Sequence, residues 1–195
     1  MQPAKLNYKI YQGSTFQETY RWESETKVYV PIQSIAKSAP CVITTAATHQ
    51  IPVGWRFQVS GGGMKELYPT SDTYQIATGV TSNTVTINQV NSINYTTYTS
   101  NGVIAYNQPV DLSQYKARMQ FRETVDSDTV LYQATSDTGE IVLDNTYKTI
   151  TITILGNVTS LFTFSTAVYS LELYNANNVL SFLVGNLSLV PEVTR

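Results

Sequence analysis

Cysteine and histidine are nearly absent from this sequence, which contains one residue of each among its 195 residues. A lone cysteine cannot form a disulfide within the chain, and the two residues together cannot supply the four ligands of a structural zinc site. Cys41 follows a proline at the start of an expected strand, and His49 lies in a turn-rich segment. We therefore expect a buried, unreactive thiol and a structural imidazole, not a catalytic pair.

Charged residues are also scarce, at 13% of the chain, whereas an average soluble domain has about 25%. The formal net charge is −2, which argues against nucleic-acid binding through clustered Lys and Arg. The sequence has no run of about 18 apolar residues, so we expect no membrane span. Its first residues lack the apolar stretch of a signal peptide. Weakly charged surfaces repel one another little and therefore suit assembly.

Motifs for metals, cofactors and catalysis are missing or incomplete. Asp126-Ser127-Asp128 resembles the start of a calcium loop, but the glycine and glutamate required later in that loop are absent. The triple glycine at 61–63 is not followed by the Lys-Ser/Thr pair and helix of a phosphate-binding loop. We expect no metal, no cofactor and no enzymatic activity, and we interpret both segments as turns.

The residues that replace charge are Thr, Ser, Asn and Gln, together with Val, Ile and 14 Tyr. Branched and aromatic side chains pack well on pleated, half-buried surfaces. Residues 148–154 alternate Thr with Ile, and residues 116–122 alternate polar side chains with Ala117, Met119 and Phe121. A sustained period of 3.6 residues is missing. The sequence therefore predicts an all-β protein with no more than a single helical turn near 157–162.

The strand pattern also predicts how the domains are organised. Residues 38–104 contain short strands and dense turns, and strands on both sides of this segment follow a more regular spacing. Insertions between strands are tolerated at loop tips. We therefore expect a discontinuous β-sandwich over 1–37 and 105–195, interrupted by a small β-domain over 38–104.

Two tyrosines, Tyr95 and Tyr98, are the candidate interaction residues, because they lie in the polar segment 94–102. Exposed tyrosine rings suit both protein interfaces and stacking on sugars. We nevertheless expect both rings to be half-buried and to pack, with exposed interaction residues as the alternative.

The middle segment resembles a small β-barrel module that is frequent in structural proteins of tailed bacteriophages. That module is itself similar to the first catalytic-cysteine half-domain of ubiquitin-activating enzymes. The runs that carry the resemblance are PCVITT at 40–45, HQIPVGW at 49–55, VSGGGMKEL at 59–67, YQI at 74–76, NTVTI at 83–87 and NSINYTTYTSNG at 91–102. The similarity is architectural; it implies no ubiquitin chemistry and gives Cys41 no catalytic role.

The flanking segments resemble the immunoglobulin-like amino-terminal domain of upper-baseplate and related virion proteins. The matching runs are LNYKIYQGSTF at 6–16, DLSQYKARMQFR at 111–122, YSLEL at 169–173, LVGNLSL at 183–189 and PEVTR at 191–195. The resemblance implies an immunoglobulin-like sandwich with a β-barrel insertion, in a non-enzymatic virion protein assembled in the host cytoplasm. Its implied partners are other virion proteins and copies of itself, with no nucleic acid and no membrane.

A tail, baseplate or neck adaptor is the first placement that follows. A capsid decoration or collar protein and a tail-fibre chaperone are the alternatives within the same setting. A carbohydrate-binding module for host recognition, with Tyr95 and Tyr98 as its stacking residues, is the alternative from another functional class.

Overall fold

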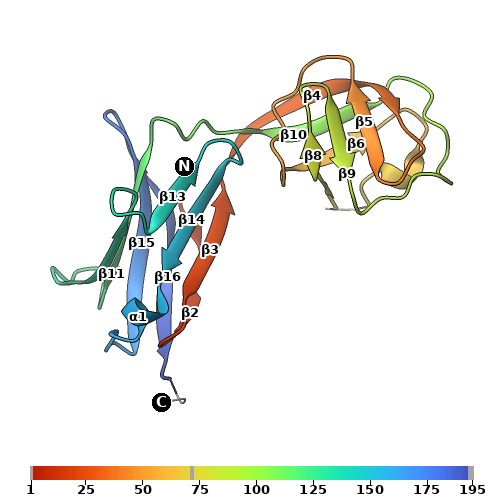
Figure 1. Ribbon diagram of the computed structural model, residues 1–195. Helices are drawn as coiled ribbons and strands as arrows, with labels where there is room; N and C mark the ends of the chain where they lie inside the picture. The colour runs from red at the N-terminus through yellow and green to blue at the C-terminus, as the bar shows by residue number, and fades with distance from the viewer. Residues whose placement is uncertain (1, 71–72, 193–195) are drawn as a thin grey trace. The chain divides into compact units, whose positions relative to one another are not determined.

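Strands dominate the protein, and the expected all-β class is confirmed. The computed structural model describes residues 2–70 and 73–192, and half of the chain is in strands (Figure 1). The chain forms two compact units, of which unit 1 comprises 1–21 and 111–195 and unit 2 comprises 22–110. The curled sheets form a sandwich-like arrangement.

Unit 1 contains two sheets. The larger sheet has the order β1 (Ala4–Lys5), β16 (Val179–Val190), β15 (Thr166–Tyr174), β11 (Lys116–Arg122) and β12 (Val130–Thr135), and β2 (Tyr8–Tyr11) also pairs with β16. The smaller sheet has the order β13 (Ile141–Asp144), β14 (Thr149–Ile154) and β3 (Phe16–Arg21). The single-turn helix α1 (Gly156–Thr159) follows β14, close to where the sequence predicts a helical turn.

Alternation along the strands of unit 1 builds its core. Every second residue of β11 and of β14 is fully buried, as the sequence pattern predicts: Ala117, Met119, Phe121, Ile150, Ile152 and Ile154. The residues between them are the polar ones, because successive side chains of a strand point to opposite faces. The hairpin expected between residues 174 and 179 is also present, since β15 and β16 pair in antiparallel register.

A tyrosine cluster joins the smaller sheet of unit 1 to its larger sheet. The ring of Tyr8 lies 5.2 Å from that of Tyr169, and its hydroxyl is hydrogen-bonded to the hydroxyl of Tyr20. Tyr169 donates its own hydroxyl hydrogen to the carbonyl oxygen of Leu6 over 3.0 Å. Burial, and then the hydrogen bond to Tyr8, raises the pKa of both Tyr20 and Tyr169 well above the ordinary value of 10.0.

Unit 2 has one curled sheet with the order β7 (Gln75–Ile76), β6 (Arg56–Ser60), β10 (Val103–Pro109), β4 (Glu23–Ile35), β5 (Cys41–Thr45), β9 (Thr84–Ile87) and β8 (Gly79–Val80). A short 3-10 turn, η1 (Lys65–Leu67), follows β6. The curl encloses one apolar cluster that includes Trp55, Phe57, Met64, Leu67 and Ile104.

The compact units divide the chain at different places from those expected. The sequence pattern assigns 1–37 and 105–195 to the sandwich and 38–104 to the insert, whereas unit 2 begins at Trp22 and ends at Val110. The reason is that β4 and β10 pair with each other and contribute Val30, Ile32 and Ile104 to the core of unit 2. Strands assigned to the sandwich from sequence therefore belong to the smaller β-domain.

The tyrosine cluster makes unit 1 sensitive to alkaline pH. A pKa that folding raises means that the cluster stabilises the fold fully below the unfolded tyrosine value near pH 10 and progressively less as pH rises above it. We expect the urea midpoint of unit 1 to fall between pH 9 and about pH 11. Tyr20→Phe is expected to make this fall shallower, because it removes a tyrosine that ionises more readily in the unfolded chain than in the folded protein. Urea titrations followed by circular dichroism measure both slopes, and identical slopes for the two proteins contradict the expectation.

Candidate functional site

The two residues with the most reactive side chains in the sequence are part of the packing of unit 2. Cys41 is completely buried, and burial raises the pKa of its thiol. The imidazole of His49 is hydrogen-bonded at both nitrogens: Nε2 lies 3.1 Å from the carbonyl oxygen of Thr84, and Nδ1 accepts the backbone N–H of Ile51 at 3.2 Å. Burial lowers the pKa of His49, which favours its neutral form.

Asp126 and Asp128 lie in the connection between β11 and β12. Over residues 2–70 and 73–192, no three His, Cys, Asp or Glu side chains are grouped so that they could hold a metal ion. Within the same described ranges, no helix has the length and apolar character needed to cross a membrane.

The candidate interaction residues Tyr95 and Tyr98 are partly buried and pack against the core of unit 2. The Tyr98 hydroxyl donates to the carbonyl oxygen of Ile32 at 2.7 Å and accepts the backbone N–H of Gly102 at 3.1 Å. Its ring lies so close to Gly62 that a Cβ added there would collide with it. Tyr98 therefore holds the loop 94–102 against β4 and the glycine turn.

Replacing Tyr98 by Phe keeps the ring but leaves the Ile32 carbonyl and the Gly102 N–H without this partner. We expect the unfolding free energy of unit 2 to fall by about 1–3 kcal/mol, the usual cost of unsatisfied buried polar groups. Tyr95→Phe is the matched control, because the Tyr95 hydroxyl takes part in no hydrogen bond in the described structure, and we expect it to cost less than about 0.5 kcal/mol. Equal losses in thermal or chemical denaturation contradict the role assigned to Tyr98.

A different part of unit 2 exposes its tyrosines to solvent. On β4, Val30 and Ile32 face the core, so Tyr29 faces outward and is 65% exposed. The strand register places Tyr29 opposite Ala105 of β10 and Ala105 opposite Gln58 of β6. Tyr74, which precedes β7 and is 40% exposed, lies one step beyond the pair formed by Phe57 and Gln75.

This arrangement defines the tyrosine-flanked face, which consists of Tyr29, Ala105, Gln58, Tyr74, Arg56 and Ile76. The two tyrosines lie at opposite ends of one row across four strand positions, and strand spacing puts them about 14 Å apart. Ala105 and Gln58 between them are small or uncharged. The row therefore has an aromatic ring at each end and small or uncharged side chains between them.

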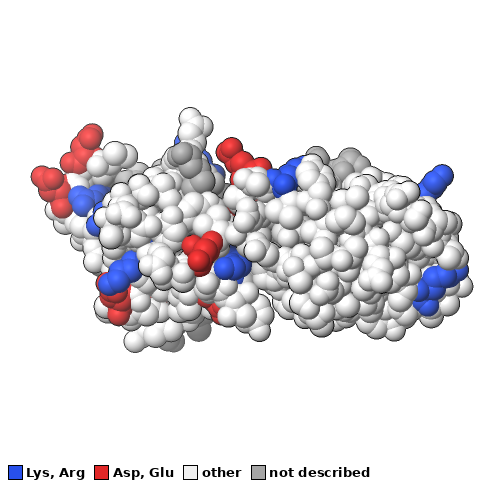
Figure 2. Space-filling model, turned by 90° about the horizontal axis from the view of Figure 1, so that it is seen from above, with Lys and Arg blue, Asp and Glu red and all other residues white. Residues whose placement is uncertain are grey.

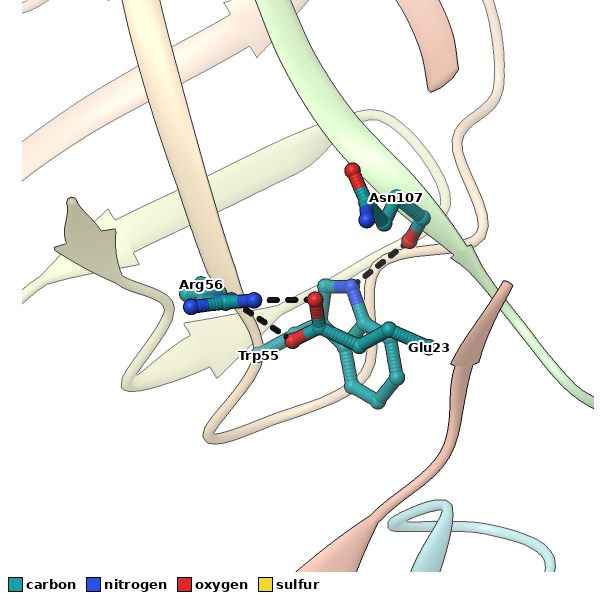
Figure 3. A network of polar contacts seen from close by, with 4 residues as sticks. All are labelled: Glu23, Trp55, Arg56 and Asn107. Carbon is teal, nitrogen blue, oxygen red and sulfur yellow. Dashed lines mark hydrogen bonds and ion pairs between the residues drawn. The ribbon is translucent and has the colours of Figure 1, made fainter. Parts of the chain in front are cut away.

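A polar network fixes one part of this face (Figure 3). Arg56 Nε donates to both carboxylate oxygens of Glu23, at 2.8 and 2.9 Å, and the guanidinium carbon lies 4.7 Å from the centre of the Tyr74 ring. The hydrogen bond to Glu23 raises the pKa of Arg56. Behind it, the buried Trp55 donates its indole N–H to the carbonyl oxygen of Asn107 at 2.9 Å. Arg56 and Tyr74 are thus held in place before any partner binds.

The chemistry of the tyrosine-flanked face is that of recognition. Tyrosine and arginine are among the side chains that contribute most often to binding energy in protein interfaces. Its cation Arg56 is paired with Glu23, whereas Lys27, which shares the outward face of β4 with Tyr29, forms no ion pair within the described residues. Charged side chains are scattered over the surface visible in Figure 2, and most of that surface is uncharged.

The sequence pattern does not single out Tyr29 or Tyr74 as interaction residues. For Tyr29 a signal is present, because in Lys27-Val28-Tyr29-Val30 the tyrosine has the same parity as Lys27 and must share its face. For Tyr74 no local signal exists, since its exposure depends on the pairing of β6 with β7.

Comparison with known proteins leaves the family open: no family description matches the chain, and no curated protein sequence matches it.

Proposed function

We propose that this chain is a non-enzymatic structural protein of a tailed-bacteriophage virion. In this proposal it acts as a tail, baseplate or neck adaptor that assembles symmetrically with copies of itself and with other virion proteins. The placement in a virion is supported by the sequence resemblance described above. The assembly mechanism is supported by one observation above all, the tyrosine-flanked face of unit 2.

The physical argument for a protein partner starts from the exposure of Tyr29. A ring that is 65% exposed on a regular strand contributes little to folding, and burying it against a partner removes apolar area from water. Interfaces are held by a few such anchors surrounded by contacts that exclude water. Ala105 beside Tyr29 leaves space in which a partner side chain can contact the ring. Because Arg56 is bridged to Glu23, a partner that covers this cation does not bury it without a counter-charge.

Glycan binding through Tyr95 and Tyr98 stays a prediction that the structure gives no reason to prefer. The Tyr98 hydroxyl and ring are both occupied within unit 2. Stacking on a sugar needs a freely presented ring face, which this geometry does not offer at Tyr98. We therefore keep assembly as the single proposed function.

The virion placement is tested with antibodies raised against the purified chain. Immunogold labelling of purified particles of the encoding phage is expected to mark one site at regular copy number. Unlabelled particles, in a preparation where the antibody still recognises the denatured chain by blotting, overturn the placement. Unlabelled particles are also the result expected for an assembly chaperone, because a chaperone acts before the particle is complete and need not remain in it.

The role of the face is tested by complementing a phage that lacks the gene with variants supplied in trans. We expect the double variant Tyr29→Ala with Tyr74→Ala to reduce incorporation into purified particles at least about tenfold, the equivalent of about 1.4 kcal/mol. Ile93→Ala is the control, because Ile93 is also in unit 2 and is 51% exposed but lies outside the face. Incorporation of the double variant at the level of the control contradicts the proposal.

A further inference from the structure

The outward face of the larger sheet in unit 1 carries a row of cations. Lys116, Arg118 and Arg122 alternate with the buried residues of β11, so all three point away from the core. Gln120 lies between the two arginines. Hollows follow this face along β11 and the adjacent β15.

At one end of the row the positive charge is neutralised. Lys116 Nζ lies 2.8 Å from a carboxylate oxygen of Asp137, and Arg118 Nε lies 2.7 Å from one of Glu172. The guanidinium carbon of Arg118 is also 5.4 Å from the centre of the Tyr174 ring. Both cations are therefore paired with a carboxylate within unit 1.

At the other end the charge has no partner. Arg122 and Lys5 line one hollow of about 340 Å³, and neither forms an ion pair with any carboxylate in the described parts of the chain. Glu123, which directly follows β11, lines an adjoining hollow instead. Two cations therefore share a concave site without a fixed negative charge.

Neutral groups hold the Arg122 guanidinium in position. Its Nη1 donates to the carbonyl oxygen of Ser127, and its Nη2 donates to Oε1 of Gln120 at 3.0 Å. Gln120 is oriented in turn, because its Nε2 donates to Oε1 of Gln133 at 2.7 Å. The hydrogen bonds that connect Gln133 of β12 to Gln120 and Gln120 to Arg122 hold the cation in place without neutralising its charge. A cation held in this way is the arrangement of a preorganised anion site.

Valines and the neutral polar residues Ser170 and Asn186 line the rest of the hollow. Val168 of β15 and Val184 of β16 contribute to its lining, and Val125, which is 81% exposed, also borders it. A carboxylate on a short aliphatic stem matches this combination, since the guanidinium fork suits the two oxygens and the valines suit the stem. The one aromatic side chain lining the hollow, Tyr169, is only 4% exposed, so it offers no ring for sugar stacking.

We propose that this hollow, the Arg122 site, binds the acidic side chain of a partner protein, presented on an extended segment with apolar neighbours. The assignment of the carboxylate to a protein rests on the proposed function. The binding chemistry itself does not, because it depends only on Arg122, Lys5 and the valine lining.

The test is a nuclear magnetic resonance titration of the full 15N-labelled chain with the peptide acetyl-GVEVG-amide. We expect the backbone resonances of Arg122, Ser170 and Gly185 and the Nε–H resonance of Arg122 to shift together. The matched peptide acetyl-GVQVG-amide, which lacks only the charge, is expected to bind at least about tenfold more weakly. No shifts at these positions, or equal shifts with both peptides, overturn the proposal.

Variants locate the effect. Arg122→Gln and, separately, Lys5→Gln are expected to weaken binding of the glutamate peptide, by about tenfold or more for Arg122. Arg118→Gln is the control, because it removes an equivalent cation whose charge Glu172 already neutralises. Equal weakening by Arg118→Gln overturns the site, because the effect is then one of net charge. Thermal unfolding of each variant shows whether it is folded. If Arg122→Gln is unfolded, Lys5→Gln decides the test, because it removes no hydrogen bond of the described structure.

Two further ligands test the choice of occupant. Glucuronate and inorganic phosphate are titrated under the same conditions as the peptide. Tighter binding of either than of the glutamate peptide overturns the assignment to an acidic side chain and identifies a sugar acid or a phosphate as the ligand. Because this titration needs no virion, its failure and the failure of the particle-labelling experiment are independent results.

Discussion

The pairing of β4 with β10 is the contact on which the organisation of unit 2 depends. It joins residues near 23–31 to residues near 103–109, which are separated by most of the unit, and it places Val30 and Ile104 in the core. The same register puts Tyr29 beside Ala105 on the opposite face. Because side chains alternate along a strand, the register that buries one set of side chains also exposes the other set. The core of unit 2 and its tyrosine-flanked face are thus two consequences of one strand register.

Low charge has different effects at different places in this protein. On the tyrosine-flanked face Arg56 is paired with Glu23, so a partner that covers Arg56 does not bury it without a counter-charge. On β11 the same scarcity makes one unpaired cation distinctive. Both Arg118 and Arg122 lie on the outward face of this strand, and the difference between them is that Glu172 is paired with only the first. The presence or absence of a fixed counter-charge therefore distinguishes the two arginines of β11.

The sequence predicts local features of this fold well because they depend on near neighbours. The buried faces of β11 and β14, the hairpin between β15 and β16 and the short helical turn all follow from alternation or from turn residues. The extent of the inserted unit does not follow, because alternation assigns Val28 and Val30 to one face without naming the partner strand. Pro31 supplies part of that information, because it indicates a bend or an edge. The partner of β4 changes from β10 to β5 just after it.

The candidate sites show the same limit for a physical reason. Tyr98 lies in a run of polar residues, and its alternation with them does not reveal that its hydroxyl reaches the carbonyl of Ile32, which is far away in sequence. Tyr29 lies in an apolar alternation, yet it is the most exposed of the large aromatic side chains described. The exposure of a side chain depends on both of the strands or loops that meet, and the local pattern around a residue describes only one of them. What separates Tyr95 and Tyr98 from Tyr29 is whether the ring packs against the core of unit 2, and that is decided by contacts between distant segments.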